Sequence, residues 1–110
     1  MQVQAITKNV RMSAQKMREM VRQIQGLPAL HAQAVLAVVP RKSARVVAKT
    51  LRSAIANAEN NNGAKPETLK VKEAVAQTAS TLKRFTPKAR GSAGPILKRS
   101  CHVKIVVSDE

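Results

Sequence analysis

The chain has 110 residues, which fits one domain and leaves no room for a second independent fold. Twenty lysine and arginine residues against six aspartate and glutamate residues give a formal net charge of +14, which a compact chain tolerates best beside a polyanion. Hydrophobic residues make up 44%, but with one Phe and no Trp or Tyr they predict a thin aliphatic core, which disfavours both an enzymatic pocket and base stacking.

A strand and a helix are predicted in the first 26 residues. Residues 1–11 alternate weakly, and one side of this strand is formed by Val3, Ala5 and Thr7. Ser13 is a natural N-cap for the helix that follows, and Gly26 is placed at its C-cap. The apolar face of this helix consists of Met17, Met20, Val21 and Ile24.

Two further helices are predicted before residue 63. The first is short because Pro28 and Pro40 bound it, and its face consists of Leu30, Ala34 and Val38. The second runs from Arg41 to the stop at residues 60–63, and its alanine-rich face should let other elements approach closely, so we expect it to be central. This face consists of Ala44, Val47, Ala48, Leu51, Ile55 and Ala58. A separate basic stripe consists of Arg41, Arg45, Lys49 and Arg52.

The second half of the chain reads as strands. Leu69, Val71 and Val75 are expected on one face of a strand that Glu73 interrupts. A hairpin then leads outward over residues 82–85, turns over 87–95 and returns over 96–107. The face of its return strand that can pack consists of Val103, Ile105 and Val107.

The hairpin is too basic to be buried in a core. Residues 81–104 contain no acid and seven cations, which are Lys83, Arg84, Lys88, Arg90, Lys98, Arg99 and Lys104. The pairs 83–84 and 98–99 should lie on opposing strands, where they concentrate donors for phosphate oxygens. We expect RNA or DNA to order this ribbon.

No catalytic residue, metal site or cofactor is predicted. The acidic residues are scattered, and no phosphate-binding loop is present. Cys101 and His102 point to opposite faces of a strand, and Cys101 shares the face of Val103, which indicates a core position. An enzyme would need a turnover that depends on Cys101 or His102. The chain is also expected to lack a membrane-spanning segment or signal peptide, and one cysteine fits a reducing cytosol.

Two kinds of nucleic-acid partner remain. A DNA-binding helix-turn-helix is the rival hypothesis, because a short turn at Gly26 joins the first two predicted helices, and a nucleoid-type DNA protein would share the basic charge. The basic residues are spread over most of the chain, which fits a protein embedded in folded RNA better than one that binds DNA through a single recognition helix.

The sequence resembles a known family in blocks that cover nearly the whole chain. They are residues 13–18 (SAQKMR), Ala48–Lys49 with 51–60 (LRSAIANAEN), 69–71 (LKV), Lys83–Arg84 with 87–91 (PKARG), and 96–100 (ILKRS) with His102. In this order they resemble the universal large-subunit ribosomal protein family numbered twenty-two in the bacterial series.

The resemblance implies an α+β fold in which three helices pack on a small antiparallel sheet and a long β-hairpin protrudes. Residues 1–110 would form one domain, with a lobe of residues 1–80 and 101–110 and a hairpin arm of residues 81–100. It also implies a non-enzymatic, cytoplasmic ribosomal component that binds several domains of large-subunit (23S) rRNA, supports assembly and lines the peptide exit tunnel with its hairpin. Neighbouring large-subunit proteins and the nascent peptide would be further partners.

The family's contacts map onto individual residues. The implied RNA-binding residues are Arg11, Lys16, Arg18, Lys49, Asn57, Lys83, Arg84, Lys88, Arg90, Lys98, Arg99, Ser100 and His102. The implied hairpin tip at the tunnel is formed by Pro87, Lys88, Ala89, Arg90, Gly91, Ser92 and Ala93.

Overall fold

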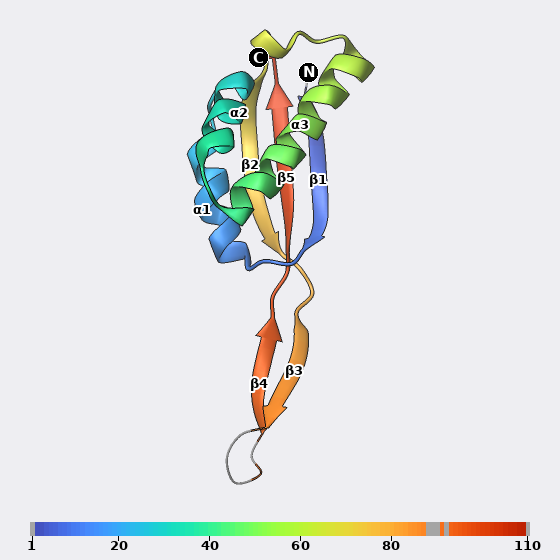
Figure 1. Cartoon of the computed structure of the whole chain (residues 1–110). Coiled ribbons are helices and arrows are strands. Elements are labelled where there is room, and N and C mark those ends of the chain that lie inside the picture. The colour runs from blue at the N-terminus through green and yellow to red at the C-terminus, as the bar shows by residue number, and fades with distance from the viewer. Residues whose placement is uncertain (1, 88–90, 92, 110) are drawn as a thin grey trace.

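Three helices pack against a three-stranded antiparallel sheet, and a two-stranded hairpin projects from one end of that sheet (Figure 1). The structure is a computed structural model that describes residues 2–87, 91 and 93–109, with the backbone alone at 84–87 and 93–96. The molecule measures 63 × 25 × 17 Å. The predicted α+β class with three helices on a small antiparallel sheet is confirmed.

The larger sheet has the order β1-β5-β2, so the last strand is the central one. Its strands are β1 (Gln2–Val10), β2 (Lys70–Thr78) and β5 (Cys101–Ser108). Along β5, alternate side chains are fully buried, and these are Cys101, Val103, Ile105 and Val107. In the register between the strands, Val3 pairs with Val107 and Ala5 with Ile105. The predicted inward face of β5 is therefore confirmed.

Strand β2 departs from the predicted alternation at a β-bulge. Its register against β5 shifts between Val71, which pairs with Val107, and Glu73, which pairs with Val106. Beyond this shift Ala74 and Ala76 are buried, whereas Val75 is only half-buried. The prediction that Val75 shares the face of Val71 was wrong, because the extra residue in a bulge reverses the period-two pattern. The bulge also leaves Glu73 exposed instead of interrupting the core.

Helix α1 (Ala14–Ile24) has the predicted start and the predicted buried face. The Ser13 Oγ accepts a hydrogen bond from the Lys16 backbone N–H at 3.4 Å, which satisfies one of the free donors at the helix start. All four apolar residues expected inward are buried. The C-cap is Gln25, one residue before the predicted position, and Gly26 follows with φ +86°, a left-handed conformation that glycine adopts without strain.

Replacing Ser13 with alanine should lower the free energy of unfolding by about 1 kcal/mol, the usual cost of a lost N-cap. Ser53→Ala is the matched control, because Ser53 is exposed on α3 and caps no helix. Urea denaturation followed by circular dichroism measures both values. Equal losses in the two variants would show that the Ser13 hydroxyl does not act as a cap.

Helix α2 (Ala29–Val38) buries a different face from the one predicted. Ala29, Ala32 and Leu36 are buried, whereas Leu30 is 44% and Val38 is 79% exposed, and Ala34 is exposed too. The helix carries apolar residues on all sides, so hydrophobic periodicity could not identify the inward face. Contacts with other elements decide which side of the helix is buried. Helix α2 packs on α3, and the Ala29 N–H donates to the Leu69 C=O at 2.9 Å.

Helix α3 (Lys42–Asn62) lies across the sheet and contacts β1, β5, α1 and α2, which confirms its predicted central place (Figure 1). It ends at Gly63, which has φ +64° and donates its N–H to the Glu59 C=O at 3.1 Å. A single-turn 3-10 helix, η1 (Pro66–Thr68), then leads into β2. The four residues of the predicted basic stripe are all exposed, and they are Arg41, Arg45, Lys49 and Arg52.

The arm consists of β3 (Leu82–Pro87) and β4 (Ala93–Lys98), which pair with each other and not with the larger sheet (Figure 1). The predicted return strand over 96–107 is therefore two strands, broken at residues 99–100. Pairing also extends closer to the tip than the predicted turn over 87–95, since Pro87 pairs with Ala93. Residues 88–90 and 92 of the predicted tip lie outside the described residues.

The two basic pairs of the arm lie on opposing strands but out of register. Lys83 pairs with Leu97, and Arg84 pairs with Ile96. Like charges directly opposite each other on a sheet are unfavourable, and this stagger sets Lys83, Arg84 and Lys98 each opposite an aliphatic residue. The prediction that the basic pairs lie on opposing strands is confirmed for Lys83, Arg84 and Lys98.

A candidate nucleic-acid interface at the neck

Cationic side chains gather where the arm leaves the larger sheet. We call this region the neck and define it as residues 11–18, 41–43, 78–81 and 97–100. It joins the link between β1 and α1, the starts of α1 and α3, and the two segments that lead into and out of the arm. Residues far apart in the sequence thus share one end of the lobe.

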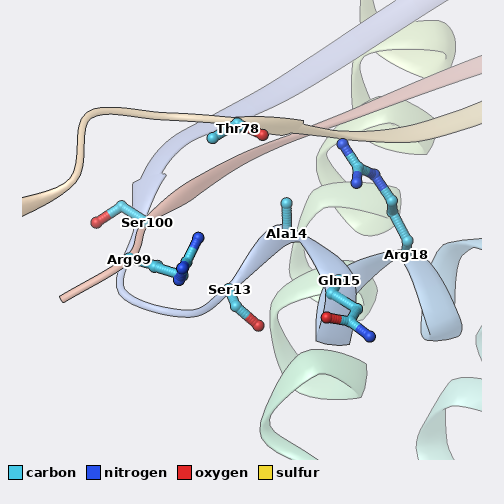
Figure 2. A pocket seen from close by; sticks show the side chains of 7 residues that line it. All are labelled: Ser13, Ala14, Gln15, Arg18, Thr78, Arg99 and Ser100. Atoms are coloured by element: carbon cyan, nitrogen blue, oxygen red, sulfur yellow. The ribbon is translucent and has the colours of Figure 1, made fainter. Parts of the chain in front are cut away.

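A pocket of about 430 Å³ opens on one side of the neck (Figure 2). Figure 2 shows the first turn of α1 on one wall and the segments around Thr78 and Arg99 on the other. The Arg18 Nε donates to the Ala76 C=O at 3.1 Å, which fixes that side chain beside the pocket. The pocket is lined by Ser13, Ala14, Gln15, Arg18, Thr78, Arg99 and Ser100. Two guanidinium groups beside a helix start are suited to an anion such as phosphate.

A second pocket, of about 410 Å³, also includes Ser13 and Arg99 in its wall. Four of its lining side chains are cations, and its full lining is Arg11, Met12, Ser13, Lys16, Lys42, Leu97 and Arg99. With no acid in either lining, both pockets should attract negative charge.

Glu19, an acid close to these pockets, already has a partner. Glu19 lines a neighbouring hollow of about 430 Å³ together with Lys16, Arg41 and Lys42. Its Oε2 lies 3.4 Å from the Arg41 Nη1, and both side chains are 57% exposed. An exposed pair of this kind contributes at most about 1 kcal/mol to stability, but it offsets one arginine and not the cations of the two pockets.

The structure brings together five of the implied RNA-binding residues. They are Arg11, Lys16, Arg18, Arg99 and Ser100, and all of them line the two neck pockets. Sequence reasoning missed Lys42, whose Nζ donates to the Arg11 C=O at 3.1 Å. The signal was present in the basic pair at positions 41–42, but nothing in the sequence indicates that the start of α3 packs beside residue 11.

The other implied RNA-binding residues lie elsewhere. Lys49 is exposed and Asn57 half-buried on α3, away from the neck pockets, while Lys83 and Lys98 are exposed at the root of the arm. His102 is half-buried in β5, where its Nδ1 accepts the Asn9 N–H at 3.0 Å. For Arg84 only the backbone is described, and the expected contacts at positions 88 and 90 lie outside the described residues.

Cys101 occupies the core position that the sequence predicted. Its side chain is fully buried in β5. Burial raises the pKa of the thiol, and the nearby positive charge of Arg18 offsets this only in part. The group is therefore a protonated, small apolar side chain rather than a nucleophile.

The described residues contain neither a metal-binding cluster nor a membrane-spanning helix. No group of three or more histidine, cysteine, aspartate or glutamate residues in that part of the chain is arranged to hold a metal ion. No helix formed by residues 2–87, 91 or 93–109 has the length and apolarity to cross a membrane.

Fold and site together define a class of small, strongly basic α+β proteins that carry a projecting hairpin on a cationic neck. Comparison with known proteins gives the family. The family model described as "Ribosomal protein L22p/L17e" matches residues 5–108. The chain is 54% identical to the large ribosomal subunit protein uL22 of Opitutus terrae over 109 residues, which cover 99% of this chain and 96% of the relative. It is 43% identical to the protein of the same name from Akkermansia muciniphila over 110 residues, which cover 100% of this chain and 98% of the relative.

The chain belongs to the ribosomal protein L22p/L17e family. The resemblance inferred from the sequence blocks is thereby confirmed. Members of this family are structural components of the large ribosomal subunit and not enzymes, which agrees with the expected location in the cytoplasmic ribosome.

Proposed function

We propose that this protein binds large-subunit rRNA through the neck and the arm, and thereby links separate RNA segments during subunit assembly. The observation that carries the proposal is the convergence of Lys16, Arg18, Lys42 and Arg99 around two adjoining pockets that no acid lines. Family membership supports rRNA as the polyanion. The phosphate backbone is the target, because the chain has one Phe and no Trp or Tyr for stacking on bases.

The arm supports the same proposal because an isolated two-stranded hairpin needs contacts with a partner to be stable. A two-stranded hairpin without a packed face is at best marginally stable in water. The root of this arm exposes Leu82, Lys83, Leu97 and Lys98, and β3 and β4 pair only with each other. Surrounding RNA would supply counter-charge and contacts along the arm. We expect the lobe to anchor the protein and the arm to reach a second RNA segment.

The tip of the arm, residues 87–93, is proposed to contribute to the wall of the peptide exit tunnel and to meet the nascent peptide. This part rests on the resemblance of residues 83–84, 87–91 and 96–100 to the family pattern. The elongated form of the molecule, 63 Å in its longest dimension, supports a reach well beyond the lobe. Neighbouring large-subunit proteins are proposed as further partners.

The helix-turn-helix alternative finds no support in α2. In such a motif the second helix enters the major groove and carries the base contacts. Helix α2 contains no lysine, arginine, aspartate or glutamate, and its exposed side includes Leu30 and Val38. Its polar side chains are limited to His31 and Gln33, so it offers no lysine or arginine for phosphate contacts.

A titration at matched salt tests the proposal. The protein is added to a folded fragment of large-subunit rRNA and, separately, to duplex DNA with the same number of phosphates, and binding is followed by fluorescence anisotropy. We expect tighter binding to the rRNA fragment, with a steep dependence on salt concentration. Equal or tighter binding to the duplex DNA would favour the nucleoid-type alternative.

A further inference from the structure

We infer that Arg11 is a positioning residue that sets the direction of the arm before any RNA is bound. Its Nη1 donates to the Arg99 C=O at 2.8 Å, across 88 positions of the sequence. Arg11 directly follows β1, and Arg99 lies in the break between β4 and β5. The bond therefore ties the edge of the lobe to the root of the arm.

The neck is a place where strand pairing alone does not fix direction. Pairing in the larger sheet reaches Thr78 and Cys101, and pairing in the arm begins at Leu82 and Lys98. Residues 79–81 and 99–100 between them belong to no strand. Unequal segments of three and two residues join the two sheets, so a hinge is expected here unless other contacts hold it.

Contacts from two sides hold the segment of residues 99–100, which returns from the arm to β5. From the β2 side, the Ala79 N–H donates to the Ser100 C=O at 3.0 Å. From the β1 side, Arg11 holds the adjacent carbonyl, that of Arg99. Hydrogen bonds to two neighbouring carbonyls from opposite edges of the sheet restrict rotation of the arm relative to the lobe. A hydrogen bond to only one of these carbonyls would allow the arm to rotate.

Lys42 completes the arrangement by holding Arg11 itself. Its Nζ donates to the Arg11 C=O at 3.1 Å, so the start of α3 supports the backbone from which the Arg11 side chain extends. The chain of contacts runs from α3 through Arg11 to the arm. The guanidinium of Arg11 thus binds a carbonyl at the root of the arm, whereas that of Arg18 binds the Ala76 carbonyl within the lobe.

Residual dipolar couplings of the backbone amides test this inference on the free, full-length protein. In the wild type, one alignment tensor should fit the amides of β1, β2, β5, β3 and β4. In Arg11→Ala, the couplings of β3 and β4 should shrink and require their own smaller tensor, while those of the larger sheet stay unchanged. Unchanged arm couplings in Arg11→Ala would overturn the inference.

Two further variants sharpen the result. Arg22→Ala removes the same charge from an exposed position in the last turn of α1, and it should leave the arm couplings as in the wild type. Arg11→Lys keeps a donor that can reach a carbonyl and should restore part of the arm's order. Loss of order in Arg22→Ala equal to that in Arg11→Ala would show an effect of charge alone and overturn the inference. Because no RNA is present, these outcomes are independent of the proposed function.

RNA binding gives a second readout. Arg11→Ala should weaken binding by about 2- to 10-fold, the effect of one net hydrogen bond. The slope of log affinity against log salt should match that of Arg22→Ala, because a positioning residue releases no counterion of its own. A slope flatter than that of Arg22→Ala by about 0.7 to 0.9 would identify Arg11 as a phosphate contact instead.

Discussion

The triple replacement of Lys16, Lys42 and Arg99 with glutamine should flatten the salt dependence of rRNA binding by about 2 to 3 in the log–log slope. Each phosphate contact contributes about 0.7 to 0.9 to that slope, depending on whether the RNA is single-stranded or duplex. All three side chains are exposed and line the same neck pocket. Glutamine keeps their polarity and much of their length, so the change removes charge rather than packing. Filter binding of the rRNA fragment at several salt concentrations measures the slope.

A matched triple at the opposite end of the sheet separates local contacts from overall charge. Lys65, Lys70 and Lys72 are exposed around η1 and the start of β2, far from the arm (Figure 1). Changing them to glutamine lowers the net charge by the same amount. This control should lose little of the slope. If both triples flatten it equally, binding depends on net charge, and the neck is not the interface.

The elements that the sequence predicted well are those whose pattern repeats over several turns or residues without interruption. Helix α1 has four apolar residues at helical spacing and a capping serine, and its buried face matches the prediction fully. Strand β5 lies between two neighbours and alternates from Cys101 to Ile105, and the inward face predicted for it is buried through Val107. In both cases the local pattern and the tertiary packing favour the same arrangement.

The sequence could not predict features that depend on a distant part of the chain. Helix α2 carries apolar residues on all sides, so its buried side depends on its packing against α3 and on the bond from Ala29 to Leu69. The bulge at β2 shifts Ala74 inward because β5 offers one residue against two. Neither signal is present in the local sequence.

Some residues of the candidate site could be predicted from the sequence, and others could not. Lys16, Arg18 and Arg99 were identified through the resemblance to a family, because charge runs alone do not separate a binding surface from a solvated one. Lys42 was missed because its place depends on how α3 begins relative to the end of β1. The bond between Arg11 and the Arg99 carbonyl joins residues 88 positions apart, which no sequence spacing predicts.

Replacing Ile105 with alanine should lower the free energy of unfolding by about 2 to 5 kcal/mol, the range measured for large-to-small changes in cores. Ile105 is fully buried in the central strand of the sheet. Its partners across the sheet are Ala5 on β1 and Ala74 on β2. Alanines cannot extend into the space that the lost side chain leaves, so the cavity should persist and the cost should lie in the upper half of that range.

A loss of this size is a large part of the roughly 5 to 15 kcal/mol that stabilises a typical domain, so the effect should be plain in urea denaturation. Ile6→Ala is the control, since Ile6 is 46% exposed on the neighbouring strand β1 and pairs with Lys104. It should cost below about 1 kcal/mol, because a half-exposed side chain leaves no closed cavity. Similar losses in the two variants would mean that the core at Ile105 collapses around the smaller residue. In a thin, alanine-rich core, the few large side chains contribute a disproportionate share of the stability. The neck cations depend on this core, because they lie close together only while the lobe is folded.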